Sequence, residues 1–87
     1  MKKIRILVVE DQHIVREGMV AILSLQADME IVGEAENGIQ AVQLARKTKP
    51  DVVLLDMVMP QQDGLATIPK LKEVSPNIRI LVLSSFA

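Results

Sequence analysis

Short apolar runs alternate along this chain with longer stretches of helical periodicity. Ile4 to Val9 is an almost continuous apolar run, typical of a strand that is covered on both faces. Met29 to Ala35 is a weaker strand, and Ile78 to Leu83 is a fourth. Val52 to Leu55 is the most continuous run and the best candidate for a central strand. The pattern predicts four strands.

Two of the segments between these strands predict regular helices. From Gln12 to Leu25 the apolar residues recur every three to four positions, and Asp11 is available as an N-cap. Asn37 can cap a second helix that runs to about Lys47, before Pro50 ends the segment.

The third helical segment contains a proline. A loop from Met57 to Gly64 leads into a helix of about Leu65 to Val74, with Pro69 inside it. A proline in a helix interior costs about 3 kcal/mol, whereas the first turn tolerates it. We therefore expect this helix to begin near Thr67.

The order βαβαβαβ with short connections predicts an α/β fold, a doubly wound parallel sheet with right-handed crossovers. In such sheets ligands bind outside the carboxyl ends of the strands. Glu10 and Asp11 follow the first strand, Asp56 closes the third, and Ser84 follows the fourth. Because these ends share one edge, the sequence predicts a single acidic site.

The chemistry of this site follows from its carboxylates. Each close pair repels by about 4 kcal/mol at an effective dielectric constant near 20, so a cation must offset the repulsion or protons must be taken up. An all-oxygen site favours Mg²⁺, with Mn²⁺ as an alternative. Glu10 and Asp11 would hold the metal, and Asp56 would be an ionised nucleophile able to accept a phosphoryl group as an acyl phosphate.

The acidic residues belong to a larger pattern that resembles the receiver domain of bacterial two-component response regulators. Its joint order and spacing is far more specific than any single motif. The matching positions are Glu10-Asp11, Asp56-Met57-Val58-Met59-Pro60, Asp63-Gly64 and Ser84. The resemblance implies a flavodoxin-like receiver fold, with Pro60 and Gly64 as structural positions after the acidic strand end.

The resemblance also implies roles for individual residues. Asp56 would be the phosphoacceptor, and Glu10, Asp11, Asp56 and the backbone carbonyl of Val58 would coordinate Mg²⁺. Ser84 would hydrogen-bond the new phosphoryl oxygen. The phosphodonor would be a phosphohistidine of a sensor histidine kinase or a small phosphorylated metabolite. Such a receiver is a stoichiometric phosphoacceptor rather than an enzyme.

The chain also departs from the family pattern. Glu10 stands where Asp is commoner, which adds one methylene to the metal reach. Receivers have five strands and five helices, so the pattern identifies residues 1–87 as a C-terminally truncated receiver that lacks the last strand, the last two helices and any output domain. The fifth strand of the family supplies a lysine that contacts the phosphoryl group, and no catalytic lysine is assigned here. Arg16-Glu17-Gly18-Met19 and Ile31-Val32-Gly33-Glu34-Ala35 resemble the subfamily with a C-terminal helix-turn-helix output domain.

Truncation predicts two consequences. A charge-assisted hydrogen bond from Ser84 contributes roughly 1.5–3 kcal/mol, whereas driving a two-state equilibrium from 1:99 to 99:1 needs about 5.5 kcal/mol, so we expect impaired switching. The fourth strand becomes an apolar edge, and strands one and three lose cover on one face. We therefore expect self-association, a domain-swapped dimer or partial unfolding. The alternative function is a non-signalling truncated receiver that acts as a self-association or partner-binding module.

Composition narrows the function classes further. The chain has 87 residues, is 49% hydrophobic and carries a net charge of -1, with dispersed lysines and arginines, which predicts one small domain without a basic face for nucleic acid or an anionic membrane. The absence of cysteine excludes disulfides and thiolate sites. Arg5 interrupts the first apolar run, and Glu10-Asp11 end it too early for a signal peptide or a membrane span. We expect a cytoplasmic protein.

Other classes of phosphate-binding protein fit the sequence poorly. No glycine-rich loop follows the first strand, which disfavours a P-loop or dinucleotide site, and Val58 stands where a haloacid-dehalogenase-type phosphatase would need a second aspartate.

Three polar residues are interpreted as structural. His13, in the first turn of a helix, is more typical of a solvated residue than of a ligand. Lys70 and Lys72 are most simply a solvated helix face.

Overall fold

The computed structural model describes residues 2–56 and 63–83, with side chains for all of these except 56 and 63–65. Its elements follow the predicted order along the chain. They are β1 (Ile4–Val9), α1 (His13–Ser24), β2 (Met29–Ala35), α2 (Gly38–Thr48), β3 (Val52–Asp56), α3 (Asp63–Val74) and β4 (Arg79–Leu83).

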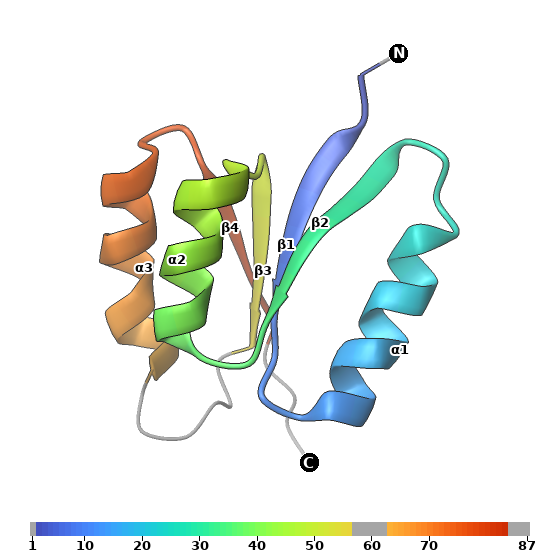
Figure 1. The fold of residues 1–87 in the computed structure, drawn as a ribbon, viewed down its shortest axis with the longest axis horizontal. Coiled ribbons are helices and arrows are strands. Elements are labelled where there is room, and N and C mark those ends of the chain that lie inside the picture. Colours follow the sequence, from blue (N-terminus) through green and yellow to red (C-terminus); the bar gives the residue numbers. More distant parts are fainter. Residues whose placement is uncertain (1, 57–62, 84–87) are drawn as a thin grey trace.

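The four strands form one parallel sheet in the order β2-β1-β3-β4. Figure 1 shows α1 on one face of this sheet and α2 with α3 on the other. The predicted doubly wound α/β fold is therefore confirmed. The strand order places β1 and β3 side by side at the centre, with Val9 opposite Leu55.

Alternate residues of the two central strands supply two separate cores. Leu7, Val9, Val53 and Leu55 are fully buried in the cluster that includes α2 and α3 residues. Ile6, Val8 and Leu54 belong to a second cluster, against which Met19, Val20 and Leu23 of α1 pack. Because successive side chains of a strand point to opposite faces, a continuous apolar run is what a sheet covered on both sides requires.

The ends of α2 are as the sequence predicts. The Asn37 side-chain oxygen accepts a hydrogen bond of 2.9 Å from the backbone N–H of Gln40. At the other end Lys49 adopts a left-handed conformation with φ of 50°, and its N–H donates to the carbonyl of Ala45 at 2.8 Å. The buried Pro50 follows and leads directly into β3.

The predicted N-cap of α1 is wrong. Gln12, not Asp11, occupies the N-cap position, and its own side chain makes no capping hydrogen bond. The Glu10 carboxylate instead accepts a hydrogen bond of 2.9 Å from the Gln12 backbone N–H. Glu10, whose side chain is longer than that of Asp11, therefore supplies the acceptor at the start of α1.

The predicted start of α3 is also wrong. The helix begins at Asp63, so Gly64 lies in its first turn rather than in a loop, and Pro69 lies inside it. Leu71 is fully buried in the core beneath α3. Burying such a side chain contributes about 1.5–3 kcal/mol, which is comparable with the proline penalty, so packing overrides local preference.

The edge strand β4 exposes several apolar side chains. In the described part of the chain β4 pairs only with β3, and Leu81, Val82 and Leu83 are between 41% and 54% exposed. The central strands keep their cover, since Val8 and Leu54 are buried. The expectation that strands one and three lose cover is therefore wrong, because α1 packs over this face of β1 and β3 but leaves β4 open.

A hydrogen bond joins the end of α3 to the residue before β4. The Lys72 ammonium donates to the carbonyl of Ile78, so this lysine is tied to the start of β4 rather than free in solvent.

Across residues 2–56 and 63–83, no helix has both the length and the apolar character that a membrane span needs.

Candidate functional site

The acidic residues predicted from sequence lie where two neighbouring strands end. Glu10 and Asp11 follow β1, and Asp56 is the last residue of β3. Val9 and Leu55 are register partners, so the next residue of each strand, Glu10 and Asp56, stands at the same level of the sheet. The fold thus brings together at one edge two positions that are 46 residues apart in the sequence.

Glu10 is held firmly in this edge. Its residue surface is only 2% exposed, and its backbone N–H donates to the Ala35 carbonyl at 2.9 Å. One carboxylate oxygen accepts the Gln12 N–H described above. Asp11 is half-buried beside it. A buried carboxylate fixed by backbone hydrogen bonds is pre-organised for a ligand, because little side-chain entropy remains to be lost.

Arg16 of α1 is a residue that sequence reasoning did not place in the site. Its Nη1 donates to the Glu10 carbonyl at 2.7 Å, and its Nη2 donates to His13 Nδ1 at 3.1 Å. Its Nε lies 3.4 Å from a carboxylate oxygen of Glu34, which belongs to β2. The Arg16 side chain is only 12% exposed. It therefore ties the acidic loop to α1 and β2 at once.

A signal for Arg16 was present in the sequence. It opens the tetrapeptide Arg16-Glu17-Gly18-Met19, noted above only as a subfamily resemblance. An arginine one turn into a helix that follows two acidic residues can reach back to their backbone. The expectation for His13 fits the structure, since its side chain is 69% exposed and lies 3.0 Å from the Glu17 carboxylate.

The structure describes the remaining predicted site residues only in part. Val58, Pro60 and Ser84 lie outside the described residues, and for Asp56 the structure describes the backbone alone. Among the described side chains, no three His, Cys, Asp or Glu residues form a group able to hold a metal. Two of the predicted ligands, Glu10 and Asp11, are described. They are hard oxygen donors at one strand end, a donor type that fits Mg²⁺ or Mn²⁺ and not a soft metal.

Comparison with known proteins identifies the family. The model of the response regulator receiver domain matches residues 6–87. The chain belongs to this family. It is a receiver domain of the two-component response regulator type, with the flavodoxin-like fold in the seven elements described above.

Relatives and solved structures agree with this assignment. The receiver domain is 40% identical over 83 residues to the uncharacterized transcriptional regulatory protein YhcZ of Bacillus subtilis and to the response regulator protein VraR of Staphylococcus aureus. These matches cover 95% of this chain but only 39% and 40% of the relatives. The signal receiver domain of the putative response regulator NarL from Mycobacterium tuberculosis is 36% identical, with a TM-score of 0.88 over 100% of this chain and 70% of that one.

Proposed function

We propose that this receiver domain is a Mg²⁺-dependent phosphoacceptor that takes a phosphoryl group on Asp56. One observation carries the proposal: the adjacent parallel strands β1 and β3 end at a single edge of the sheet, where the buried Glu10 follows β1 and Asp56 closes β3. Asp11 would hold the cation together with Glu10 and Asp56. The Val58 carbonyl and the Ser84 hydroxyl are further proposed contacts, to the metal and to the phosphoryl group.

The proposed step is a phosphoryl transfer to a carboxylate. An Asp56 oxygen forms a new bond to phosphorus, the bond from phosphorus to the donor breaks, and the donor leaves with that electron pair. The cation, when bound, would neutralise charge on the transferring group. Glu10 and Asp11 orient the cation, and Arg16 keeps the backbone of Glu10 in place. The step consumes no reactant other than the phosphodonor.

The wider role extends the same proposal. The chain spans about 40% of the length of the curated relatives it matches, and those relatives are named as regulatory proteins. A sensor histidine kinase is the proposed phosphodonor, in the cytoplasm. Transcription regulation would be the output of a longer protein that carries this receiver.

Intact mass spectrometry tests the proposal directly. The chain is incubated with acetyl phosphate and Mg²⁺, and in parallel with acetyl phosphate and a chelator. We expect a mass increase of one phosphoryl group only with the metal. An adduct of equal yield in the chelator, or none with any acyl phosphate or phosphohistidine donor, would contradict the proposed function.

Substitution of Arg16 by methionine is expected to weaken Mg²⁺ binding by about tenfold or more, since groups that orient metal ligands contribute 10–100-fold to affinity. Methionine keeps the packing of the aliphatic stem but removes the donors to the Glu10 carbonyl. Isothermal titration calorimetry with Mg²⁺ measures the change.

Arg46→Met is the matched control for Arg16→Met. Arg46 lies in the last turn of α2 and is exposed, so the charge lost is the same but the acidic edge is untouched. Arg16→Lys should recover part of the affinity. If Arg16→Met and Arg46→Met bind Mg²⁺ equally well, the hydrogen bond from Arg16 does not position the acidic loop.

Self-association is a second candidate function, favoured by the exposed edge of β4. Leu81, Val82 and Leu83 expose apolar surface on a strand that pairs on one side only within the described residues. Light scattering of residues 1–87 is expected to show a dimer or larger species. Leu81→Lys should reduce its mass to that of a monomer, because edge lysines disfavour strand pairing. A wild-type chain that is a compact monomer at high concentration contradicts this candidate.

A further inference from the structure

A groove runs between α2 and α3, with a volume of about 270 Å³. Its walls are formed by Gly38, Ile39, Val42, Gln43 and Arg46 of α2 and by Ala66, Thr67 and Lys70 of α3. The α2 residues recur every three to four positions, so they lie along one side of that helix. Gly38 and Ala66 have little or no side chain, which leaves space between the two helices.

The end of the groove nearest to the helix starts is apolar. Ile39 is 72% exposed there, and the half-buried Val42 lies about one turn further along α2. An apolar side chain that entered this end would remove the Ile39 surface from water. The hydrophobic effect therefore favours such an occupant.

The other end of the groove is basic. Arg46 lies in the last turn of α2, and Lys70 lies in the second half of α3. Neither forms an ion pair with a described residue, and the described lining contains no Asp or Glu. Both charges are thus available to carboxylates of another molecule, with no acidic side chain in the groove to compete.

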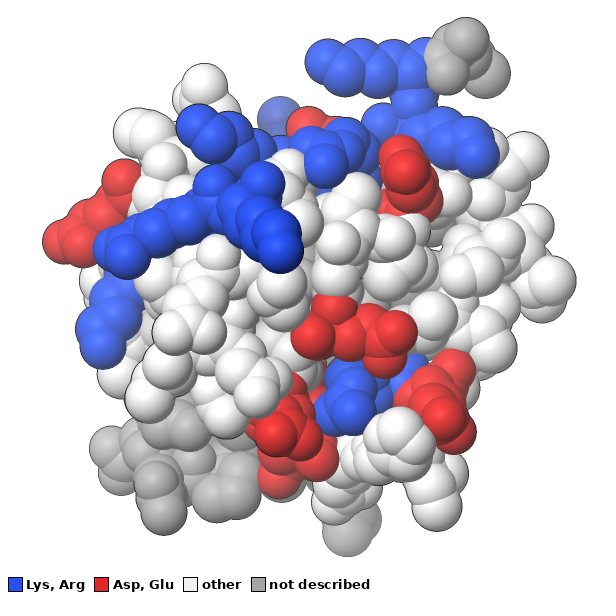
Figure 2. Space-filling model, viewed as in Figure 1, with Lys and Arg blue, Asp and Glu red and all other residues white. Residues whose placement is uncertain are grey.

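The charge of the whole molecule is divided in the same sense. Figure 2 shows most of the visible lysine and arginine side chains towards the end that holds the N-terminus, away from the acidic edge. The expectation of dispersed basic residues is therefore wrong, because the fold gathers cations that are far apart in the sequence. Such a field attracts acidic groups to the basic end of the groove and repels them from its apolar end.

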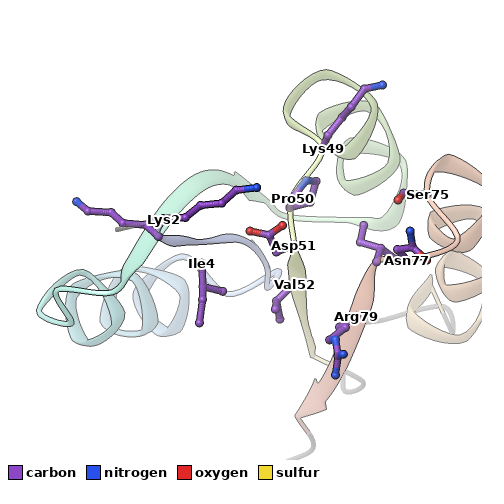
Figure 3. Close-up of a pocket in the computed structure, with 11 residues that line it drawn as sticks. Lys2, Ile4, Lys49, Pro50, Asp51, Val52, Ser75, Asn77 and Arg79 are labelled. Carbon is purple, nitrogen blue, oxygen red and sulfur yellow. The ribbon is translucent and has the colours of Figure 1, made fainter.

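A larger hollow, of about 510 Å³, lies at the amino ends of the strands but lacks this order. Figure 3 shows the side chains of Lys2, Lys49 and Arg79 pointing away from one another there, around the Asp51 carboxylate. They share no common position for a ligand. In the groove between α2 and α3, by contrast, apolar and basic residues follow one another along a single line.

We propose that the groove between α2 and α3 binds an acidic amphipathic helix of a partner protein. Helices that lie in grooves present anchors at positions i, i+3 or i+4, and i+7. Ile39 and Arg46 are seven residues apart, which is about 10 Å along a helix axis. A helix beside α2 would place apolar side chains against Ile39 and Val42, and acidic ones two turns away against Arg46 and Lys70.

Fluorescence anisotropy with a labelled synthetic peptide at fixed ionic strength tests this site. The probe is an alanine-based helix with two leucines one turn apart and two glutamates two turns beyond the first leucine. Saturable one-to-one binding is expected. The same peptide with lysines in place of the glutamates should bind at least about tenfold more weakly, because two attractive charge pairs become repulsive.

A variant that fills the groove separates insertion from general charge attraction. Ala66→Gln places a longer side chain in the apolar part and should weaken binding of the glutamate peptide by about tenfold, since the leucines lose their space. Ala21→Gln is the matched control, because Ala21 is exposed on α1 outside the groove. It should bind as the wild type does.

A second pair of variants tests the basic end. Arg46→Gln/Lys70→Gln should weaken binding of the glutamate peptide by about threefold or more, the loss of two exposed charge pairs. Lys3→Gln/Lys47→Gln removes the same charge from exposed positions outside the groove and should leave binding unchanged.

Amide chemical shifts in nuclear magnetic resonance spectra locate the bound peptide. They should change in α2 and α3. The proposal is overturned by shifts elsewhere, by no saturable binding at millimolar peptide, or by equal binding of each variant and its control. Changes in the same amides when the chain alone is concentrated would identify a second copy as the occupant and also overturn it. Asp56→Asn should bind the peptide as the wild type does, so the result is independent of the phosphoacceptor proposal.

Discussion

Replacing Asp56 with asparagine is expected to abolish phosphoryl transfer to this receiver domain completely. The substitution keeps the size and shape of the side chain, but a neutral amide oxygen is not a nucleophile that forms a stable acyl phosphate. Asp56 is the last residue of β3, and its register partner is Leu83 of β4, so its backbone pairing is kept. Intact mass after incubation with acetyl phosphate and Mg²⁺ should show no adduct, while thermal unfolding stays cooperative.

Asp51→Asn is the matched control for this result. It makes the same chemical change immediately before the same strand, but at the opposite edge of the sheet. The Arg5 N–H that donates to its carboxylate finds an equivalent oxygen in asparagine. Phosphorylation of this variant should equal that of the wild type. If Asp56→Asn still gains a phosphoryl group, another side chain is the acceptor and the proposed role of Asp56 is wrong.

The positions of the strands could be predicted because each signal is local. Met29–Ala35 has the predicted bounds, and Asn37 caps α2 through the hydrogen bond to Gln40 that its residue type favours. The expected edge that combines Glu10 with Asp56 follows from topology, because parallel strands end on one side. These inferences needed only residue type, period and order along the chain.

The features that sequence reasoning missed depend on contacts between distant segments. The role of Arg16 requires the end of β2, where Glu34 lies, to stand beside the start of α1. The hollow of about 510 Å³ at the amino ends of the strands is lined by Lys2, Pro50 and Asn77 from separate segments, which the strand order brings to one end of the sheet. For α3, the burial of Leu71 outweighs the local cost of Pro69, and no local pattern reports that balance.

Leu7→Ala is expected to destabilise the fold by about 3 kcal/mol, within the roughly 2–5 kcal/mol found for buried leucines. Leu7 is fully buried in the centre of β1, in the core cluster beneath α2 and α3. A small domain has a total stability of about 5–15 kcal/mol, so this loss is a large share. Urea denaturation followed by circular dichroism measures it. Leu25→Ala is the matched control, because Leu25 is 82% exposed and should change stability by less than about 0.5 kcal/mol.

A second substitution shows whether the loss at Leu7 arises from packing on β2. A Cβ atom at Gly33 would lie 3.0 Å from Leu7 Cδ1, so Gly33→Ala alone should be destabilising because the leucine has to move. In the Leu7→Ala background that atom is gone and the added methyl enters vacated space. Gly33→Ala should then cost about 1 kcal/mol less than it does in the wild type, a coupling typical of residues in contact. Additive effects in this double-mutant cycle would mean that the core rearranges around the shortened side chain rather than keeping the cavity. In that case the need for glycine at position 33 would not arise from its contact with the Leu7 side chain.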